Sequence, residues 1–178
     1  IGPSISLNTD VTNLNVGEKA TIEVVIDTQL QPINQYSVQI LFNPENLRVL
    51  DFDDSTDTID IDFMDTFFDP VINEVSQQQG IMTFSAENPV GSSSITDRVV
   101  AKFEVMALKA GFTELTFSDQ NTMLLDASSV DILQSTNTVE FVVAGGADVP
   151  PTIVTTDQPA ISVIPTSSIL LPSRTPDT

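Results

Sequence analysis

The chain has 178 residues, and its 40% hydrophobic content is enough to fill the core of one domain. The 25 acidic residues outnumber the 6 basic ones and give a formal net charge of -19, which argues against nucleic acid as a partner because DNA and RNA are polyanions. The absence of cysteine and histidine excludes disulfides, thiolate sites, ordinary zinc sites and Ser-His-Asp or Cys-His catalysis.

These exclusions leave few catalytic chemistries. A pair of carboxylates could still hydrolyse a glycosidic bond, but no spacing among the many Asp residues selects such a pair. We therefore expect no enzyme. No run of about 18 apolar residues is present, so direct membrane insertion is not expected either.

Several segments within residues 4–50 alternate between apolar and polar side chains with the period of two that is typical of half-buried strands. Residues 4–8 predict a short strand and residues 20–28 a longer one. Residues 36–50 predict a strand, a corner at Asn43-Pro44 and a second strand-like run. The core-facing positions expected in the first of these two runs are Tyr36, Val38, Ile40 and Phe42.

Residues 51–69 contain eight Asp residues and no Lys or Arg. Uncompensated carboxylates at this density either remain in water or bind a cation. Their spacing partly matches an EF-hand loop, but Thr56 occupies the sixth position, where the sharp turn needs Gly. We expect a solvated acidic loop or edge strand, with an irregular calcium site as the alternative. The residues that match the loop are Asp51, Asp53, Ser55, Asp57 and Asp62.

The remaining strands follow between turn signals. They are predicted at residues 71–76, 81–87, 98–108, 112–118 and 138–143. On the longest, the expected core positions are Val99, Ala101, Phe103, Val105 and Ala107. The apolar connection at 119–137 is expected to pack over one end of the domain or join a surface. About nine short strands without a convincing helix predict an all-β, nine-stranded sandwich with jelly-roll or Greek-key topology.

The composition changes near residue 145. Residues 145–178 are rich in Pro, Ser and Thr and show no amphipathic period, which is typical of a linker or tail. We therefore expect one folded domain at 1–144. Such tracts often connect modules of exported proteins.

Four segments in order resemble the cohesin family, the receptor modules of cellulosome scaffoldins and related cell-surface proteins. They are VGEKATIEVVID, YSVQILFNPENLRVLDF, GIMTFSAENPVGSSSITDRVVAKFEVMALKAGFTELTFSD and TVEFVVAGG. Their order and spacing together carry the resemblance, which covers roughly residues 4–144.

The resemblance implies a jelly roll that binds a dockerin, a small calcium-loaded helical module, on one flat sheet face. It implies no cofactor on this chain, calcium on the dockerin, and an extracellular or cell-surface location. Many type I members carry Asn and Asp where this chain has Gln35 and Ser37, which leaves the dockerin type open. The positions that correspond to the family's contacts are Gln35, Ser37, Gln39, Leu41, Thr83, Ser85 and Glu87, with Asn88, Val130 and Asp131 in the flanking loops.

The residue types support the same face. The amide and hydroxyl side chains of the two strands form a neutral hydrogen-bonding surface, and Glu87 supplies a charge for a Lys or Arg of a partner. The alternative is an ordinary solvent-facing side of an antiparallel sheet.

Two other functions fit the same fold. A carbohydrate-binding module would stack sugar rings on exposed Trp or Tyr, but the chain has no Trp and its single Tyr36 is predicted to face the core. A surface adhesin or spacer domain would suit the acidic composition and the tail equally well. Both remain alternatives to dockerin binding, with polysaccharide the less favoured partner.

Overall fold

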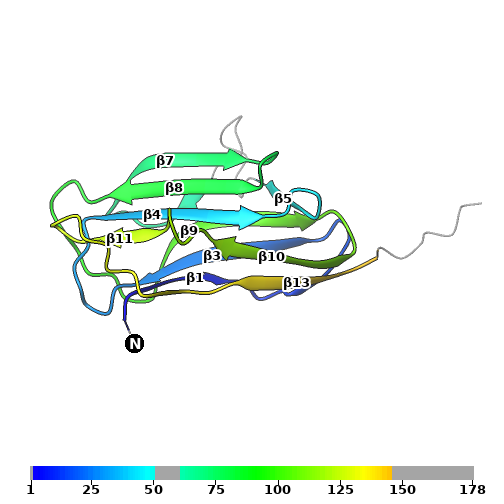
Figure 1. Cartoon of the computed structure of the whole chain (residues 1–178), viewed down its shortest axis with the longest axis horizontal. Coiled ribbons are helices and arrows are strands. Elements are labelled where there is room, and N and C mark those ends of the chain that lie inside the picture. The colour runs from blue at the N-terminus through cyan, green and yellow to red at the C-terminus, as the bar shows by residue number, and fades with distance from the viewer. Residues whose placement is uncertain (1, 51–60, 146–178) are drawn as a thin grey trace, which may run out of the picture. The chain divides into compact units, whose positions relative to one another are not determined.

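The computed structural model describes residues 2–50 and 61–145, which form two β-sheets packed into a sandwich (Figure 1). The described part contains no helix. The predicted all-β sandwich is therefore confirmed, whereas the count of nine strands is not. The strands are β1 (Ser4–Asn8), β2 (Asn13–Asn15), β3 (Lys19–Asp27), β4 (Gln35–Phe42), β5 (Leu47–Leu50), β6 (Asp62–Phe63), β7 (Asp69–Ser76), β8 (Ile81–Glu87), β9 (Arg98–Ala107), β10 (Gly111–Phe117), β11 (Met123–Leu125), β12 (Ser135–Thr136) and β13 (Val139–Ala144).

The first sheet, sheet A, has the order β12-β1-β3-β9-β5, with β6 also paired to β9. The second, sheet B, has the order β2-β13-β10-β4-β8-β7, with β11 also paired to β4. Strand β4 lies near the middle of sheet B (Figure 1). It pairs with β8 along one edge, while β11 and β10 share its other edge. The region around β4 is thus held by neighbours on both sides.

The apolar side chains of β4 lie in the core of the sandwich. Tyr36, Val38 and Ile40 are fully buried and Phe42 is nearly so, as the alternation predicts. Burying each such side chain stabilises the fold by about 1.5–3 kcal/mol relative to leaving it in water. Two aromatic rings, those of Phe68 and Phe84, pack against the Tyr36 ring at centroid distances of 5.4 and 6.5 Å.

One core prediction on β9 is wrong because the strand contains a bulge. Val24 pairs with Ala101, but the next residue of β3, Val25, pairs with Val99. Val100 is therefore the extra residue, and it is fully buried while Val99 is only partly buried. Strict alternation cannot reveal a bulge, because a bulge breaks the period of two.

The connection at residues 119–137 is also more regular than expected, since it contains β11 and β12. Strand β11 pairs with β4, which confirms that this apolar segment joins a surface. Two further short strands, β2 and β6, were not predicted. No helix of the described residues is long and apolar enough to cross a membrane.

The described sandwich ends with β13 and Gly145. The predicted tail from residue 146 onward lies outside the described residues, so the boundary near residue 145 stays a prediction. Residues 51–60, the first half of the acidic region, also lie outside the described residues.

Candidate functional site

The candidate site is the outer face of sheet B over β4 and β8. The register pairs Gln35 with Glu87, Ser37 with Ser85 and Gln39 with Thr83. Residues directly opposite each other in an antiparallel pair share one face. The structure therefore brings the predicted positions of the two strands together, and Leu41, 36% exposed, extends the row.

Gln39 is held in place by its neighbours. Its Nε2 donates a hydrogen bond to Thr83 Oγ1 at 3.2 Å, and its Oε1 accepts one from Asn121 Nδ2 at 2.8 Å. Thr122 Oγ1 bonds both the backbone N–H and the backbone carbonyl of Gln39, at 3.2 Å each. The Gln39 side chain is thus positioned before any partner arrives, which reduces the entropy that binding would cost.

Ser85 requires a correction. It lies on the outer face but is only 2% exposed, and its Oγ has no hydrogen-bond partner among the described residues. Ser85 lies between Ser37 on β4 and Ile72 on β7. The alternating pattern predicts which face a residue is on, but it does not predict whether larger neighbours cover a small side chain there. Ser85 is part of the face but does not present an accessible hydroxyl.

The predicted flanking loops adjoin the same face. Asn88 donates from Nδ2 to Ser93 Oγ at 2.8 Å and accepts from the Val90 N–H at 3.0 Å, so its side chain shapes its own loop. Asp131 forms a β-bridge with Leu125, the residue of β11 that pairs with Gln35. Val130 is 55% exposed beside it.

Apolar residues that were not predicted lie on both sides of the polar residues of β4 and β8. Met123 and Leu125 of β11 lie opposite Ser37 and Gln35, and Ile72 of β7 lies opposite Ser85. Ile72 is 39% exposed. Met123 and Leu125 alternate with the buried Leu124, but a segment of three residues is too short to predict a strand from its sequence.

Sheet B carries charge of one sign. Among the described residues its strands contain carboxylates but no Lys or Arg. Basic side chains lie on sheet A, at Lys19, Arg48, Arg98 and Lys102, and on the β9–β10 turn, at Lys109. Sheet A pairs its charges internally, Lys19 with Glu104 at 3.0 Å and Lys102 with Glu23 at 2.6 Å. The outer face of sheet B therefore carries negative charge that no basic residue of its described strands offsets.

A buried acidic group lies in the described half of the acidic region. The Asp65 side chain is fully buried, and its Oδ1 accepts hydrogen bonds from Arg98 at 3.4 Å and from the Phe67 N–H at 2.7 Å. Burial, and then the negative charge of Asp65, raises the pKa of Tyr36 well above its usual value. No group of three or more carboxylates suited to a metal ion occurs among the described residues. The calcium alternative stays a prediction, since most of its candidate ligands lie in residues 51–60.

Tyr36 is fully buried, as predicted. Because the chain has no other Tyr and no Trp, it offers neither ring as a platform for sugar stacking. The carbohydrate-binding alternative is not favoured.

Comparison with known proteins supports the fold. No family model and no curated protein matches the chain. Among solved structures, a type II cohesin domain from the cellulosome of Acetivibrio cellulolyticus is 17% identical with a TM-score of 0.64, covering 79% of this chain and 95% of its own.

Two cohesin–dockerin complexes also match the chain, with similar TM-scores. A type I cohesin–dockerin complex from Clostridium thermocellum matches at 12% identity and a TM-score of 0.61, covering 82% of this chain and 95% of that one. A type II cohesin–X–dockerin complex from Acetivibrio cellulolyticus matches at 17% identity and a TM-score of 0.58, covering 80% and 95%. The chain therefore has the fold of the cohesin modules.

Proposed function

We propose that this chain is a non-catalytic protein-binding module that captures a calcium-loaded dockerin on the outer face of sheet B around β4 and β8. The observation that carries the proposal is the match of nearly the whole sandwich to cohesin modules, including modules solved in complexes with dockerins. The face itself suits a protein partner because it is an open sheet surface with positioned polar groups and apolar residues at its sides.

The charge of the face specifies the partner's chemistry. Glu87 is exposed, and its carboxylate makes no ion pair or hydrogen bond with any described residue. Asp69 lies opposite it on β7, so two like charges share one end of the face. A Lys or Arg of the dockerin placed here would relieve their repulsion, while Met123, Leu125 and Ile72 would contact its apolar side chains.

In the proposed complex the calcium belongs to the dockerin, and this chain supplies no catalytic group. We place the module outside the cell or at its surface, as part of a scaffold for polysaccharide breakdown. The Pro/Thr/Ser-rich composition of residues 145–178 supports that location.

A binding screen against a panel of calcium-loaded dockerins tests the proposal. We expect at least one dockerin to bind, and binding to be lost when a chelator removes its calcium. In that pair Glu87→Lys should weaken binding about tenfold or more, because the introduced ammonium repels the partner's cation. Isothermal calorimetry measures both effects.

Glu45→Lys is the matched control. Glu45 is exposed in the corner after β4, whereas Glu87 pairs with the first residue of β4, so the two lie toward opposite ends of that strand. The control makes the same change in charge and should alter affinity less than about twofold. Failure of every dockerin to bind contradicts the proposed partner, and equal effects of the two variants contradict the proposed face.

A further inference from the structure

A second surface lies on β10 and β13, toward the edge of sheet B. Phe112 lies opposite Val142, and Glu114 lies opposite Glu140. Residues two apart along a strand share a face, so these four side chains form one outward cluster, the β10–β13 cluster. Phe112 is 57% exposed and Val142 is 59% exposed, and both glutamates are exposed as well. An apolar pair thus borders an acidic pair.

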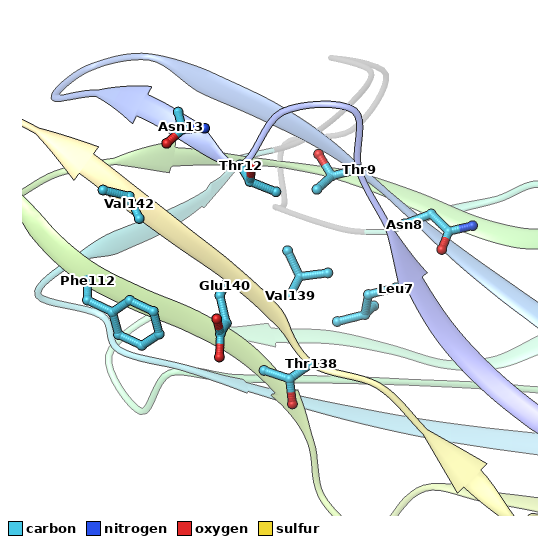
Figure 2. A pocket seen from close by; sticks show the side chains of 10 residues that line it. All are labelled: Leu7, Asn8, Thr9, Thr12, Asn13, Phe112, Thr138, Val139, Glu140 and Val142. Atoms are coloured by element: carbon cyan, nitrogen blue, oxygen red, sulfur yellow. The ribbon is translucent and has the colours of Figure 1, made fainter.

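The surface around this cluster is hollowed. A groove of about 540 Å³ extends from Phe112 across β13, with Glu140 and Thr138 on one side and Thr12 and Asn8 on the other (Figure 2). It forms because β2 pairs with β13 only from Val142 to Ala144, while β1 belongs to sheet A. A second hollow, of about 320 Å³, extends from Phe112 toward Leu41 on β4. Phe112 therefore has open space on two sides.

The acidic pair is costly to the free protein. Like charges directly opposite each other destabilise an antiparallel sheet. The described strands of sheet B contain no Lys or Arg, and neither Glu114 nor Glu140 forms an ion pair with a described residue. A cation from outside the sheet would remove this repulsion.

We propose that the β10–β13 cluster binds a lysine or arginine side chain carried by an extended segment of a partner protein. The aliphatic stem lies along Phe112 and Val142, which shields their exposed apolar surface. The charged head group lies between the carboxylates of Glu114 and Glu140, which provides two charge-assisted hydrogen bonds. The proposal does not require dockerin binding, because it is centred on β10 and β13, but the two surfaces adjoin, since Leu41 of β4 lines the same hollow as Phe112.

Nuclear magnetic resonance of the isotope-labelled full chain tests the contact. The probe is a nine-residue peptide with blocked ends in which lysine alternates with valine and serine. We expect the largest amide shifts at residues 112–114 and 140–142. Replacing lysine by arginine should preserve binding, and replacing it by glutamine should abolish it. The double variant Glu114→Gln/Glu140→Gln should weaken the affinity about tenfold or more.

Glu74→Gln is the matched control, because Glu74 is exposed on the same sheet but lies opposite the neutral Thr83. It should change the affinity less than about twofold. Without peptide, Glu140→Gln should raise Tm by about 1–2 °C, since it removes a like-charge pair, whereas Glu74→Gln should not.

Four results of the lysine-peptide and stability measurements would overturn the proposal. They are no shifts at about 1 mM peptide, shifts spread evenly over the acidic surface, equal weakening by Glu74→Gln, and a fall in Tm for Glu140→Gln. Shifts at the groove with a neutral cello-oligosaccharide but none with the lysine peptide would also overturn it, and would assign the groove to a sugar.

Discussion

Replacing Gly80 by alanine should destabilise the fold by about 3 kcal/mol. Gly80 precedes β8 and has a φ of 67°, in the left-handed region that costs an L-residue about 1–2 kcal/mol. A Cβ at this position would lie 2.0 Å from the Phe42 carbonyl oxygen and 2.9 Å from Pro44 Cδ. The Phe42 N–H donates to the Gly80 carbonyl at 2.9 Å, so moving the turn away would break a bond to the end of β4. Urea unfolding measures the loss as a lower midpoint.

Gly17→Ala separates the backbone strain from the steric clash. Gly17 also has a positive φ, 89°, but a Cβ there would meet no atom within 4 Å. Its substitution should cost only about 1–2 kcal/mol, the conformational term alone. If both variants lose the same stability, the β7–β8 turn does not pack against the Asn43-Pro44 corner as closely as the structure has it.

The fold was predictable where the alternation was long and unbroken. On β4 the core-facing positions predicted from the sequence are the buried ones, because the strand has one face on the core and one outside. On β9 the prediction fails at Val99, where the bulge transfers burial to Val100. The short strands β2, β6, β11 and β12 have two or three residues each, which is too few for an alternating pattern to be recognised.

The candidate site was predictable in its strands but not in its surroundings. Pairing Gln39 with Thr83 requires only the register of two neighbouring strands, and the polar residues of β4 and β8 indicated that face. The hydrogen bond from Asn121 to Gln39 joins residues 82 positions apart in the sequence, and no local pattern predicts such a contact. The separation of charge between the sheets was equally hidden, since it follows from strand order rather than from composition.

Alkaline pH should destabilise the fold through Tyr36. In the unfolded chain a tyrosine loses its proton near pH 10, whereas burial and the charge of Asp65 raise the pKa of Tyr36 in the folded state. Above about pH 10 the folded state therefore binds more protons than the unfolded state. The free energy of unfolding should fall by about 1.4 kcal/mol for each pH unit, and below pH 10 this group adds no pH dependence.

Because Tyr36 is the single tyrosine of the chain, near-ultraviolet absorbance follows its ionisation directly. We expect tyrosinate to appear only together with unfolding. Other groups, lysine side chains among them, also titrate at alkaline pH, so Tyr36→Phe isolates the tyrosine's part. This variant removes a buried hydroxyl without a hydrogen-bond partner among the described residues, so its stability at neutral pH should stay within about 1 kcal/mol. Titration of Tyr36 near pH 10 in the folded chain, or an equal alkaline loss in Tyr36→Phe, would contradict its burial beside Asp65.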